Sequence, residues 1–435
     1  MSEPANHKEA KPRLRDALTL SKDFSILLLS LAVVTLGFGI LSPIMPKYAE
    51  DRLHMDAAGL GSVYALFALS YALGMLPAGY LADRVGRKPL IIAGTLFFGF
   101  TTYALVLINA QWQFAVLRVL EGIGAALVTP AAFALTVDLV PENKRGMAMG
   151  AEGTAQLLGG LGGPGLGGFL AGEVGFYYPF YVAAVLSVIC ALLVVMIKEP
   201  KGHTRGESNS MFSMFGAWKR NLQQDSALAA VTTRGFVMGI VQGLWNLGLI
   251  LYWYDRLSMT ETEVGVAISI GALVMLLGTL PFGALADKFG RRPFMIIGGS
   301  LMVLGLLLNV WATEVWHVYV LVALADFGGA VSNPSVGAML ADVMSPKERG
   351  RVMGAYQMVQ GFGNIVGFFF LGYIYVALSP EAPIILCSAA LAVATLIIAL
   401  FVRETRKPTG SAADAGSPKP EAVSERAAGK GAGDK

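Results

Sequence analysis

Long uninterrupted apolar runs dominate this sequence and restrict its fold more than any other feature. A run of about 20 apolar residues, wound as a helix, crosses the ~30 Å hydrocarbon layer of a bilayer. Only 14% of the 435 residues are charged, whereas roughly a quarter are charged in a soluble globular protein. The chain has too few charges to cover a water-facing surface, so we expect a polytopic membrane protein and not a soluble enzyme.

The apolar runs predict an all-α membrane protein with twelve transmembrane helices. The predicted spans are 24–46, 57–80, 89–109, 112–139, 147–171, 175–197, 226–253, 263–285, 293–312, 315–343, 352–376 and 382–402. An even number of crossings places both termini on one side. Lysine and arginine stay on the cytoplasmic side during insertion, and the loops of the opposite side hold only Lys47, Arg52 and Arg256. We therefore predict cytoplasmic termini in a multi-pass protein of the bacterial plasma membrane.

The spans divide into two six-helix bundles. The expected order is a cytoplasmic N-terminal segment (1–23), a first bundle (24–197), a cytoplasmic linker (198–225), a second bundle (226–402) and a cytoplasmic tail (403–435). Within the linker, Met211–Asn221 fits either a short helix lying in the membrane interface or an unstructured segment. The tail lacks aromatic residues and cannot form a core, so we expect it to be disordered.

An internal repeat relates the two predicted bundles. The stretch GYLADRVGRKP (79–89) recurs as GALADKFGRRP (283–293), an offset of 204 residues. The same offset relates Pro130 to Pro334. Two halves of the same topology are typical of transporters with parallel repeats. In such proteins the halves rock against one another and expose a site at the membrane midplane to each side in turn.

These repeated residues resemble the major facilitator superfamily over about 24–402. The family signature GxLaDrxGrkxxl is matched from Gly79 to Lys88, and the second copy is nearly complete. The signature is placed in the loop between the second and third helices. The resemblance implies two pseudo-symmetric six-helix bundles and transport by alternating access.

The resemblance also implies a gate at this signature. Asp83 would meet helix 11, and Arg87 would pair with Asp138; closing these contacts would favour the outward-open state. The expected gating residues are Gly79, Asp83, Arg84, Gly86, Arg87, Asp138, Asp287, Arg291 and Asp342. The alternative is that the basic residues only anchor the loop on the cytoplasmic side.

A charged pair interrupts the fourth predicted helix. Arg118 and Glu121 are three residues apart and share a helix face. A charge inside the membrane is costly and marks a functional candidate. The stretch resembles the family motif RxxqGxgaA, with Glu121 in place of glutamine. Either Glu121 carries a proton while Arg118 tunes its pKa or binds an anionic substrate, or the two form a static buried pair.

The fifth predicted helix carries a glycine-rich motif. Gly159, Gly163, Pro164, Gly167 and Gly168 match gxxxGPxxGG, which is common among family members that exchange protons for exported compounds. Glycine lets a second helix pack backbone to backbone, and proline bends the segment. Such a seam would seal the pathway against leak; the alternative is a generic packing helix.

Other polar residues lie inside predicted spans and should face a central cavity. Asp326 is a second candidate for proton coupling, although it also suits a hydrogen bond between helices. Arg234 either has a role in the cavity or extends to the membrane surface. Glu152 and Gln156 are further polar positions. The expected substrate-binding residues are Gln242, Trp245, Asn246, Asn333, Gln357, Gln360 and Asn364.

The sequence favours an exporter of a small lipophilic or amphiphilic compound, driven by proton antiport. Two rivals stay open: a sugar, metabolite or lipid exporter or facilitator of the same fold, and a membrane sensor that no longer transports. The four histidines and two cysteines show no metal-ligand spacing. We expect no cofactor, protons as the coupling ion, a small-molecule substrate and the lipid bilayer as partners, no nucleic acid, and a monomer.

Overall fold

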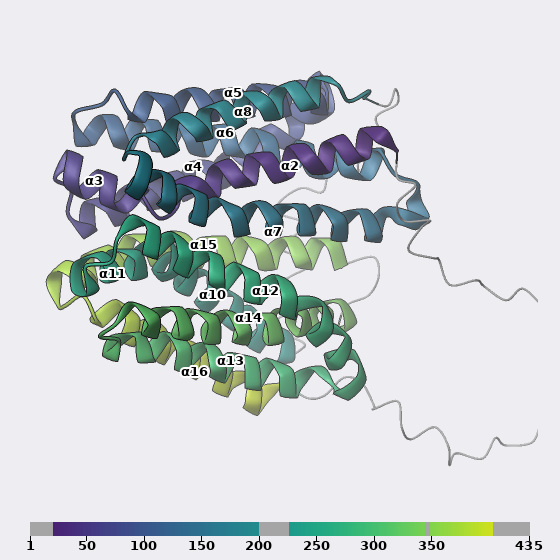
Figure 1. Cartoon of the computed structure of the whole chain (residues 1–435). Coiled ribbons are helices and arrows are strands. Elements are labelled where there is room, and N and C mark those ends of the chain that lie inside the picture. The colour runs from purple at the N-terminus through teal and green to yellow at the C-terminus, as the bar shows by residue number, and fades with distance from the viewer. Residues whose placement is uncertain (1–20, 200–225, 344–348, 403–435) are drawn as a thin grey trace, which may run out of the picture.

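The computed structural model describes residues 21–199, 226–343 and 349–402, and throughout these ranges the regular structure is helical (Figure 1). Two predictions lie outside the described residues: the interfacial helix or unstructured segment at Met211–Asn221, and the disordered tail 403–435.

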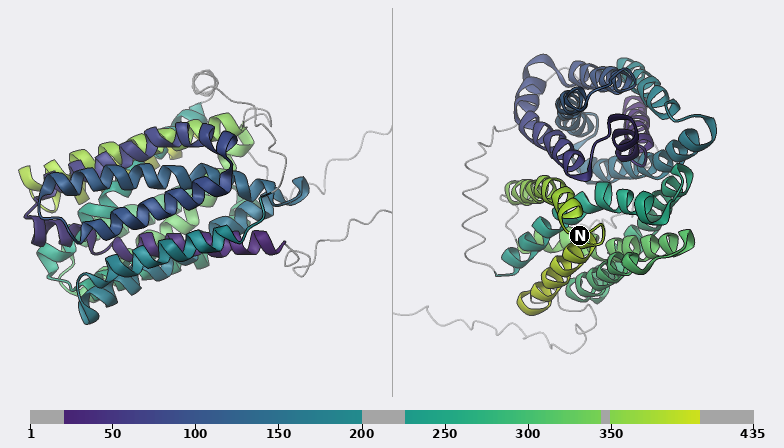
Figure 2. Two further views of the ribbon diagram at one scale, coloured as in Figure 1. Left: turned by 90° about the horizontal axis from the view of Figure 1, so that it is seen from above. Right: turned by 90° about the vertical axis from the view of Figure 1, so that its left-hand side faces the viewer.

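The helices form two bundles that lie side by side (Figures 1 and 2). The N-terminal bundle contains α2 (Lys22–Leu41), α3 (Met45–Leu53), α4 (Ala57–Val85), α5 (Arg87–Leu105), α6 (Gln111–Asp138), η1 (Glu142–Lys144), α7 (Arg145–Phe169), η2 (Leu170–Val174) and α8 (Tyr178–Val195). The C-terminal bundle contains α10 (Ser226–Gly243), η3 (Leu244–Gly248), α11 (Leu249–Leu257), α12 (Glu261–Phe289), α13 (Arg291–Leu308), η4 (Asn309–Trp311), α14 (Val315–Val343), α15 (Arg349–Ala377) and α16 (Ala382–Phe401).

These elements make a twelve-helix membrane protein. Within the described residues, eleven helical spans are long and apolar enough to cross a membrane. The twelfth is α7, which is rich in glycine and packs against α2 and α12. Large apolar side chains such as Leu73 and Leu280 point outward, with 65% and 79% of their surface exposed. That pattern suits a lipid environment and not water.

The 204-residue offset holds in three dimensions, because the same helix contacts occur in both bundles. A Cβ atom built on Gly163 would lie 2.6 Å from the Cα atom of Gly39, and one on Gly367 would lie 2.9 Å from the Cα atom of Ile240, beside Gly243. The close approach of Gly94 to Gly124 is repeated by Gly298 and Gly328, and that of Gly74 to Ala126 by Gly278 and Ala330. The two bundles are therefore copies of one packing scheme.

The signature stretch is helical in the structure, and its expected placement in a loop is wrong. Residues Gly79–Val85 belong to the last turns of α4, and α5 begins at Arg87. The connection is the single residue Gly86, whose φ is 103°; the repeat copy, Gly290, has φ 100°. A residue with a side chain is strained in this left-handed region. Glycine therefore permits the chain to reverse between two helices without any loop.

The bundles meet closely at one end and not at the other. We call the end at which α2 begins and α16 ends the terminal face, and the end that holds α3 and α11 the far face (Figure 1). Near the far face, backbones of opposite bundles touch: Gly61 lies against Phe368, and Gly168 against Glu261. Toward the terminal face, Gly79, Gly146 and Gly150 have no described atom of another element within 4 Å of an added Cβ.

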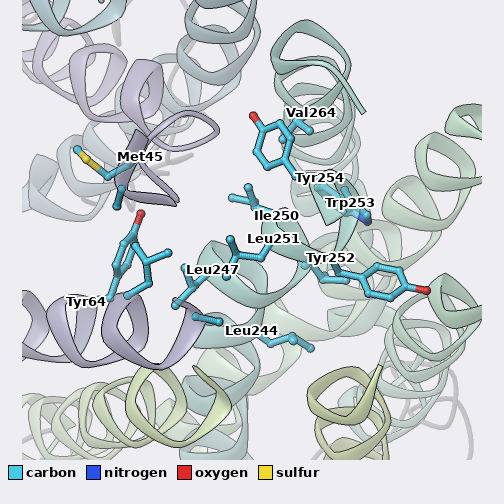
Figure 3. Packing of buried hydrophobic residues seen from close by; sticks show 14 of the residues in the cluster. Met45, Tyr64, Leu244, Leu247, Ile250, Leu251, Tyr252, Trp253, Tyr254 and Val264 are labelled. Carbon is cyan, nitrogen blue, oxygen red and sulfur yellow. The ribbon is translucent and has the colours of Figure 1, made fainter. Parts of the chain in front are cut away.

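The main apolar core also lies toward the far face and draws residues from both bundles (Figure 3). Tyr64 of α4 lies near the π-helical turn η3, which carries Leu244 and Leu247. Trp253, with 1% of its surface exposed, donates a hydrogen bond from Nε1 to Oδ1 of Asn309 at 3.2 Å. Among the described residues, the two bundles are therefore packed together at the far face, whereas the glycines named above meet no other element toward the terminal face.

Candidate functional site

The charged pair of α6 is buried, and both carboxylate oxygens of Glu121 accept hydrogen bonds. Nη1 of Arg118 donates to Oε2 of Glu121 at 2.5 Å, and the Thr102 hydroxyl donates to Oε1 at 3.1 Å. Glu121 has no exposed surface, and Arg118 has 8%. One helical turn separates the two residues, which places both side chains on the same face as expected from their spacing. The pair holds a titratable carboxyl group away from water beside its own counter-charge.

Aromatic rings connect this pair to the opposite bundle. The Arg118 guanidinium lies over the rings of Phe67, at 4.3 Å from its centroid, and Tyr64, at 5.0 Å. The ring of Tyr64 in turn packs against Phe368 of α15, with 5.2 Å between centroids. A change in the charge of Glu121 would therefore act on Arg118, and through Tyr64 on the contact between bundles.

A cavity of about 350 Å³ opens among α2, α4, α6 and α7. Its lining is mainly apolar and aromatic: Leu31, Val34, Thr35, Phe38, Phe67, Tyr71, Ala125, Val128, Thr129, Ala132, Glu152 and Gln156. Glu152 supplies the one carboxylate of this lining. The sequence marked Glu152 as a polar membrane position but assigned it no role. A comparison of the two repeat copies would have shown it, because the counterpart at offset 204 is Tyr356.

The structure does not bring Asp326 to the Arg118–Glu121 pair. Asp326 lies on α14 and faces α12, where its Oδ2 atom would be 1.9 Å from a Cβ built on Gly271. By the repeat offset, this position corresponds to Gly122, which packs against Phe67 of α4. Asp326 thus occupies a helix contact inside the C-terminal bundle. Its role in proton coupling stays a prediction.

The predicted substrate-binding residues are spread over α10, η3, α14 and α15. Gln242 is exposed, and its carbonyl oxygen accepts from Nδ2 of Asn246 at 2.9 Å. Trp245 and Asn246 lie in the π-helical turn η3, a distortion that often occurs at functional sites. Nδ2 of Asn364 points to the Gly239 carbonyl at 3.5 Å.

Three of these residues correspond, by the repeat offset, to residues that line the cavity of the N-terminal bundle. Gln242, Asn333 and Gln360 are the counterparts of Phe38, Thr129 and Gln156, all of which line that cavity. Gln357 is exposed on α15. Together they give the C-terminal bundle a polar counterpart of the cavity wall, while a binding role for each stays a prediction.

Arg234 does not extend to the membrane surface, since only 1% of its surface is exposed. Its Nη2 atom donates to the Ser332 hydroxyl at 2.6 Å, and the side chain lies near Tyr356. Within the described residues it forms no salt bridge. The C-terminal bundle therefore carries a buried cation of its own.

The glycine motif of α7 contacts both bundles. One face packs on α2: an added Cβ would lie 2.0 Å from Thr35 Oγ1 at Gly159 and 2.0 Å from the Ile40 carbonyl oxygen at Gly167. The other face packs on α12 of the opposite bundle, where the Pro164 carbonyl oxygen would be 2.4 Å from a Cβ on Gly265. Because these positions carry no side chains, α7 packs closely within its own bundle and also against α12 of the other bundle. We call this α7–α12 contact the seam.

Ser269 of α12 joins this seam by two hydrogen bonds. Its hydroxyl accepts from the Gly165 N–H at 2.9 Å and donates to the Leu161 carbonyl at 2.8 Å. Gly165 and Leu161 are a donor and an acceptor four residues apart, which an undisturbed α-helix would pair directly. The Ser269 hydroxyl of one bundle therefore bridges a backbone donor and acceptor in the helix of the other bundle, next to Pro164. Sequence reasoning missed Ser269, because its partner depends on where the bundles meet.

The signature residues of the terminal face form two similar clusters. Arg87 is buried and forms an ion pair with Asp138, and its backbone N–H donates to Glu199 at 2.7 Å. Arg291 forms ion pairs with Asp342 and Asp287. Asp83 is exposed, and the side chains at the start of α15, where its expected latch would close, lie outside the described residues. The gating roles of these residues stay predictions.

Comparison with known proteins places the chain in a family. The model of the Major Facilitator Superfamily matches residues 27–244 and 235–430. The chain therefore belongs to this superfamily of membrane transporters.

Three similar proteins with assigned names are resistance transporters. The chain is 28% identical to multidrug resistance protein 2 of Bacillus subtilis over 359 residues, covering 79% of this chain and 86% of the relative. It is 24% identical to the quinolone resistance protein NorA of Staphylococcus aureus, covering 89% and 98%, and 27% identical to the class C tetracycline resistance protein of Escherichia coli, covering 82% and 91%.

Solved structures show the same fold at lower identity. The nucleoside transporter NupG (D323A mutant) matches with a TM-score of 0.74 and 14% identity, covering 88% of this chain and 100% of that one. A D-xylose–proton symporter matches with a TM-score of 0.70 and 16% identity, covering 88% and 98%.

Proposed function

We propose that this transporter exports a small lipophilic or amphiphilic compound in exchange for protons. The observation that carries the proposal is the buried Arg118–Glu121 pair, because Val322 and Ala325 stand at the same positions of the repeat copy. The packing scheme does not require the pair, since the C-terminal bundle is built without it. Burying this carboxyl group in the membrane costs several kcal/mol of desolvation. That cost is better explained if Glu121 binds and releases a proton. The named resistance transporters among the relatives support the same class of substrate.

In this mechanism the two bundles rock between the conformation described here and one that opens at the far face. We place both termini in the cytoplasm of a bacterium, so this structure is the inward-open state. In this inward-open state Glu121 has released its proton to the cytoplasm and is paired with Arg118, whose guanidinium lies over Phe67 and Tyr64. The Ser269 bonds to α7 hold the far face closed until the substrate binds and the bundles rock. In the far-open state, protonation of Glu121 from outside would weaken its attraction to Arg118, and the return to the conformation described here would release that proton to the cytoplasm and restore the Tyr64–Phe368 contact.

Purified protein in liposomes with an imposed pH gradient tests the proposal. The probes are a quinolone, tetracycline, ethidium and sorbitol, and an enclosed pH-sensitive dye reports proton movement. We expect flux of at least one of the first three with counter-movement of protons, both lost in Glu121→Gln. Flux that ignores the gradient would instead support a facilitator, sorbitol flux a polyol carrier, and the absence of any flux a sensor.

A matched control is available in the same bundle. Glu142 and Arg145 also form an ion pair three residues apart, at 3.2 Å, but it is exposed. Glu142→Gln removes the same charge at the surface and should leave proton-coupled flux unchanged, because an exposed pair contributes about 0–1 kcal/mol.

A further inference from the structure

The cavity of the N-terminal bundle contains an incompletely bonded carboxylate. Oε1 of Glu152 accepts from Nε2 of Gln156 at 3.3 Å, while Oε2 is buried and has no hydrogen-bond partner. The Thr136 hydroxyl is a possible hydrogen-bond donor close to this carboxyl group, yet it too is buried without a hydrogen bond of acceptable geometry. Leaving a buried acceptor unpaired costs about 1–3 kcal/mol, and more for a charged group. Such a group is a candidate for contact with a ligand.

No basic side chain of the described residues forms a salt bridge with Glu152. The Arg118 guanidinium lies over Phe67, and its charge is matched by Glu121 at 2.5 Å. Glu152, with 7% of its surface exposed, thus stands at the wall of the cavity without a counter-charge among the described residues.

The repeat copy shows how the same place is filled when the protein supplies its own cation. In the C-terminal bundle, Glu152 is replaced by Tyr356, and Ser30 of α2 is replaced by Arg234 of α10. Arg234 reaches Ser332, the counterpart of the cavity-lining residue Val128. In the N-terminal bundle, Ser30 is short and bonds only to the Leu27 carbonyl of its own helix at 2.7 Å. At this place the N-terminal bundle therefore has a cavity and the carboxyl group of Glu152, but no basic side chain at the position of Arg234.

The remaining walls suit an apolar cation that carries aromatic rings. The rings of Phe67 and Tyr71 are nearly parallel, 3° apart with centroids separated by 6.5 Å, and both line the cavity with Phe38. Aromatic faces attract a cation by about 0.5–2 kcal/mol. A volume of about 350 Å³ falls within the range of roughly 300–1,000 Å³ usual for small-molecule sites.

We propose that this cavity binds a monovalent lipophilic organic cation, with Glu152 as its counter-ion and the Phe67–Tyr71 pair against its apolar body. The proposal deepens the proposed function by naming the substrate class. It assigns the charge contact to the N-terminal bundle, whereas the polar residues Gln242, Asn333 and Gln360 would face the neutral side of the ligand. An organic anion of the same shape would be rejected by Glu152.

Equilibrium binding to purified protein in detergent, without a pH gradient, tests the proposal. The probes are tetraphenylphosphonium and tetraphenylborate, which have the same shape and opposite charge. We expect the wild-type protein to bind the cation at least tenfold more tightly than the anion. Glu152→Gln should weaken cation binding at least tenfold and, by removing the charge that repels the anion, abolish the preference between the two probes, while Glu152→Asp should retain the preference for the cation.

Thermal unfolding checks that each variant is folded, and Glu142→Gln serves as a charge-matched control at an exposed position. Cation binding that does not distinguish Glu152→Gln from the wild type, or no preference of the wild type between the two probes, overturns the proposal. Because the assay requires no transport, its outcome is separate from that of the proton-antiport test. Cation binding through Glu152 without proton-coupled flux would contradict the proposed function and still support this inference.

Discussion

The two bundles share their glycine contacts but differ in their buried charges. Backbone approaches such as Gly39–Gly163 recur in the C-terminal bundle, so both halves follow the same packing plan. At equivalent depth, however, the N-terminal bundle buries Arg118, Glu121 and Glu152, where the C-terminal bundle has Val322, Ala325 and Tyr356. The C-terminal bundle in turn buries Arg234 where the N-terminal bundle has Ser30.

This difference separates scaffold from function. A residue required for the fold should be needed in both copies, because both copies use the same contacts. A charge present in one copy alone is dispensable for packing and costs several kcal/mol of desolvation. The comparison therefore favours the acidic groups of the N-terminal bundle as the first candidates for a role in the proposed transport, with Asp326 as a further candidate in the C-terminal bundle.

The largest effect should come from converting the N-terminal charge pair to its C-terminal counterpart. Glu121→Ala alone leaves Arg118 buried without its counter-charge, so we expect a loss of about 3–5 kcal/mol of stability. Adding Arg118→Val to give the Val322/Ala325 arrangement should restore most of it, because apolar replacement of a whole buried pair is often neutral. Thermal unfolding in detergent measures both.

The double variant should nevertheless show no proton-coupled flux in liposomes. If Arg118→Val/Glu121→Ala is as unstable as Glu121→Ala, the pair belongs to the scaffold. If it is stable and still couples flux to protons, the coupling group lies elsewhere, and Glu152 and Asp326 are the next carboxyl groups to replace.

A smaller effect is expected at the seam between bundles. The seam α7–α12 is repeated by α15–α4, with Gly168 on Gly265 and Gly372 on Gly61, but Ser269 is replaced there by Ala65. Ser269→Ala should remove two hydrogen bonds, worth about 1–2 kcal/mol together. The far-closed population should fall roughly 5- to 30-fold relative to the far-open one.

Distances between spin labels at Leu107→Cys and Leu378→Cys, one in each bundle near the far face, report these populations. The native Cys190 and Cys387 are buried and protected from labelling. Ser62→Ala is the control, because the Ser62 hydroxyl donates to Ala58 of its own helix at 2.9 Å. An equal effect of both substitutions would mean that Ser269 does not hold the seam.

The smallest effect concerns acid at the far face. Burial, together with the negative charges of Asp255 and Asp51, raises the pKa of Glu50 on α3 above its ordinary 4.5, while Lys47 opposes this shift. Asp255 belongs to the opposite bundle and accepts a hydrogen bond from Tyr375 at 2.5 Å. Proton binding is thus favoured when the far face is closed, and this stabilisation is lost as pH rises through the raised pKa of Glu50.

The far-closed population should accordingly fall as pH rises above about 4.5, by about 0.5 kcal/mol for a partly exposed group. Glu50→Gln should abolish that part of the pH dependence in the same spin-label measurement. A pH profile identical in Glu50→Gln and the wild type would show that the repulsion from Asp255 has no influence on closure.

The sequence predicted what depends on neighbours along the chain. Helix spans follow from apolar runs, the repeat from a fixed offset, and the Arg118–Glu121 contact from a spacing of three residues on one helix. It could not predict that Gly79–Val85 is helical, because Gly86 alone reverses the chain. Nor could it predict the bonds of Ser269 or the unpaired oxygen of Glu152, because these depend on how distant helices pack.

The glycine surface of α7 bears on how such a transporter diversifies. Where Gly168 meets Gly265, the helices touch through bare backbone, so the bundles can part and rejoin there without any change of rotamer. In the proposed mechanism this moving surface is separate from the cavity that would recognise the substrate. Substitutions at the cavity residues Phe38 or Tyr71 would then alter which compounds are accepted and leave the motion unchanged, and a small molecule bound against Gly265 would arrest transport of every substrate alike.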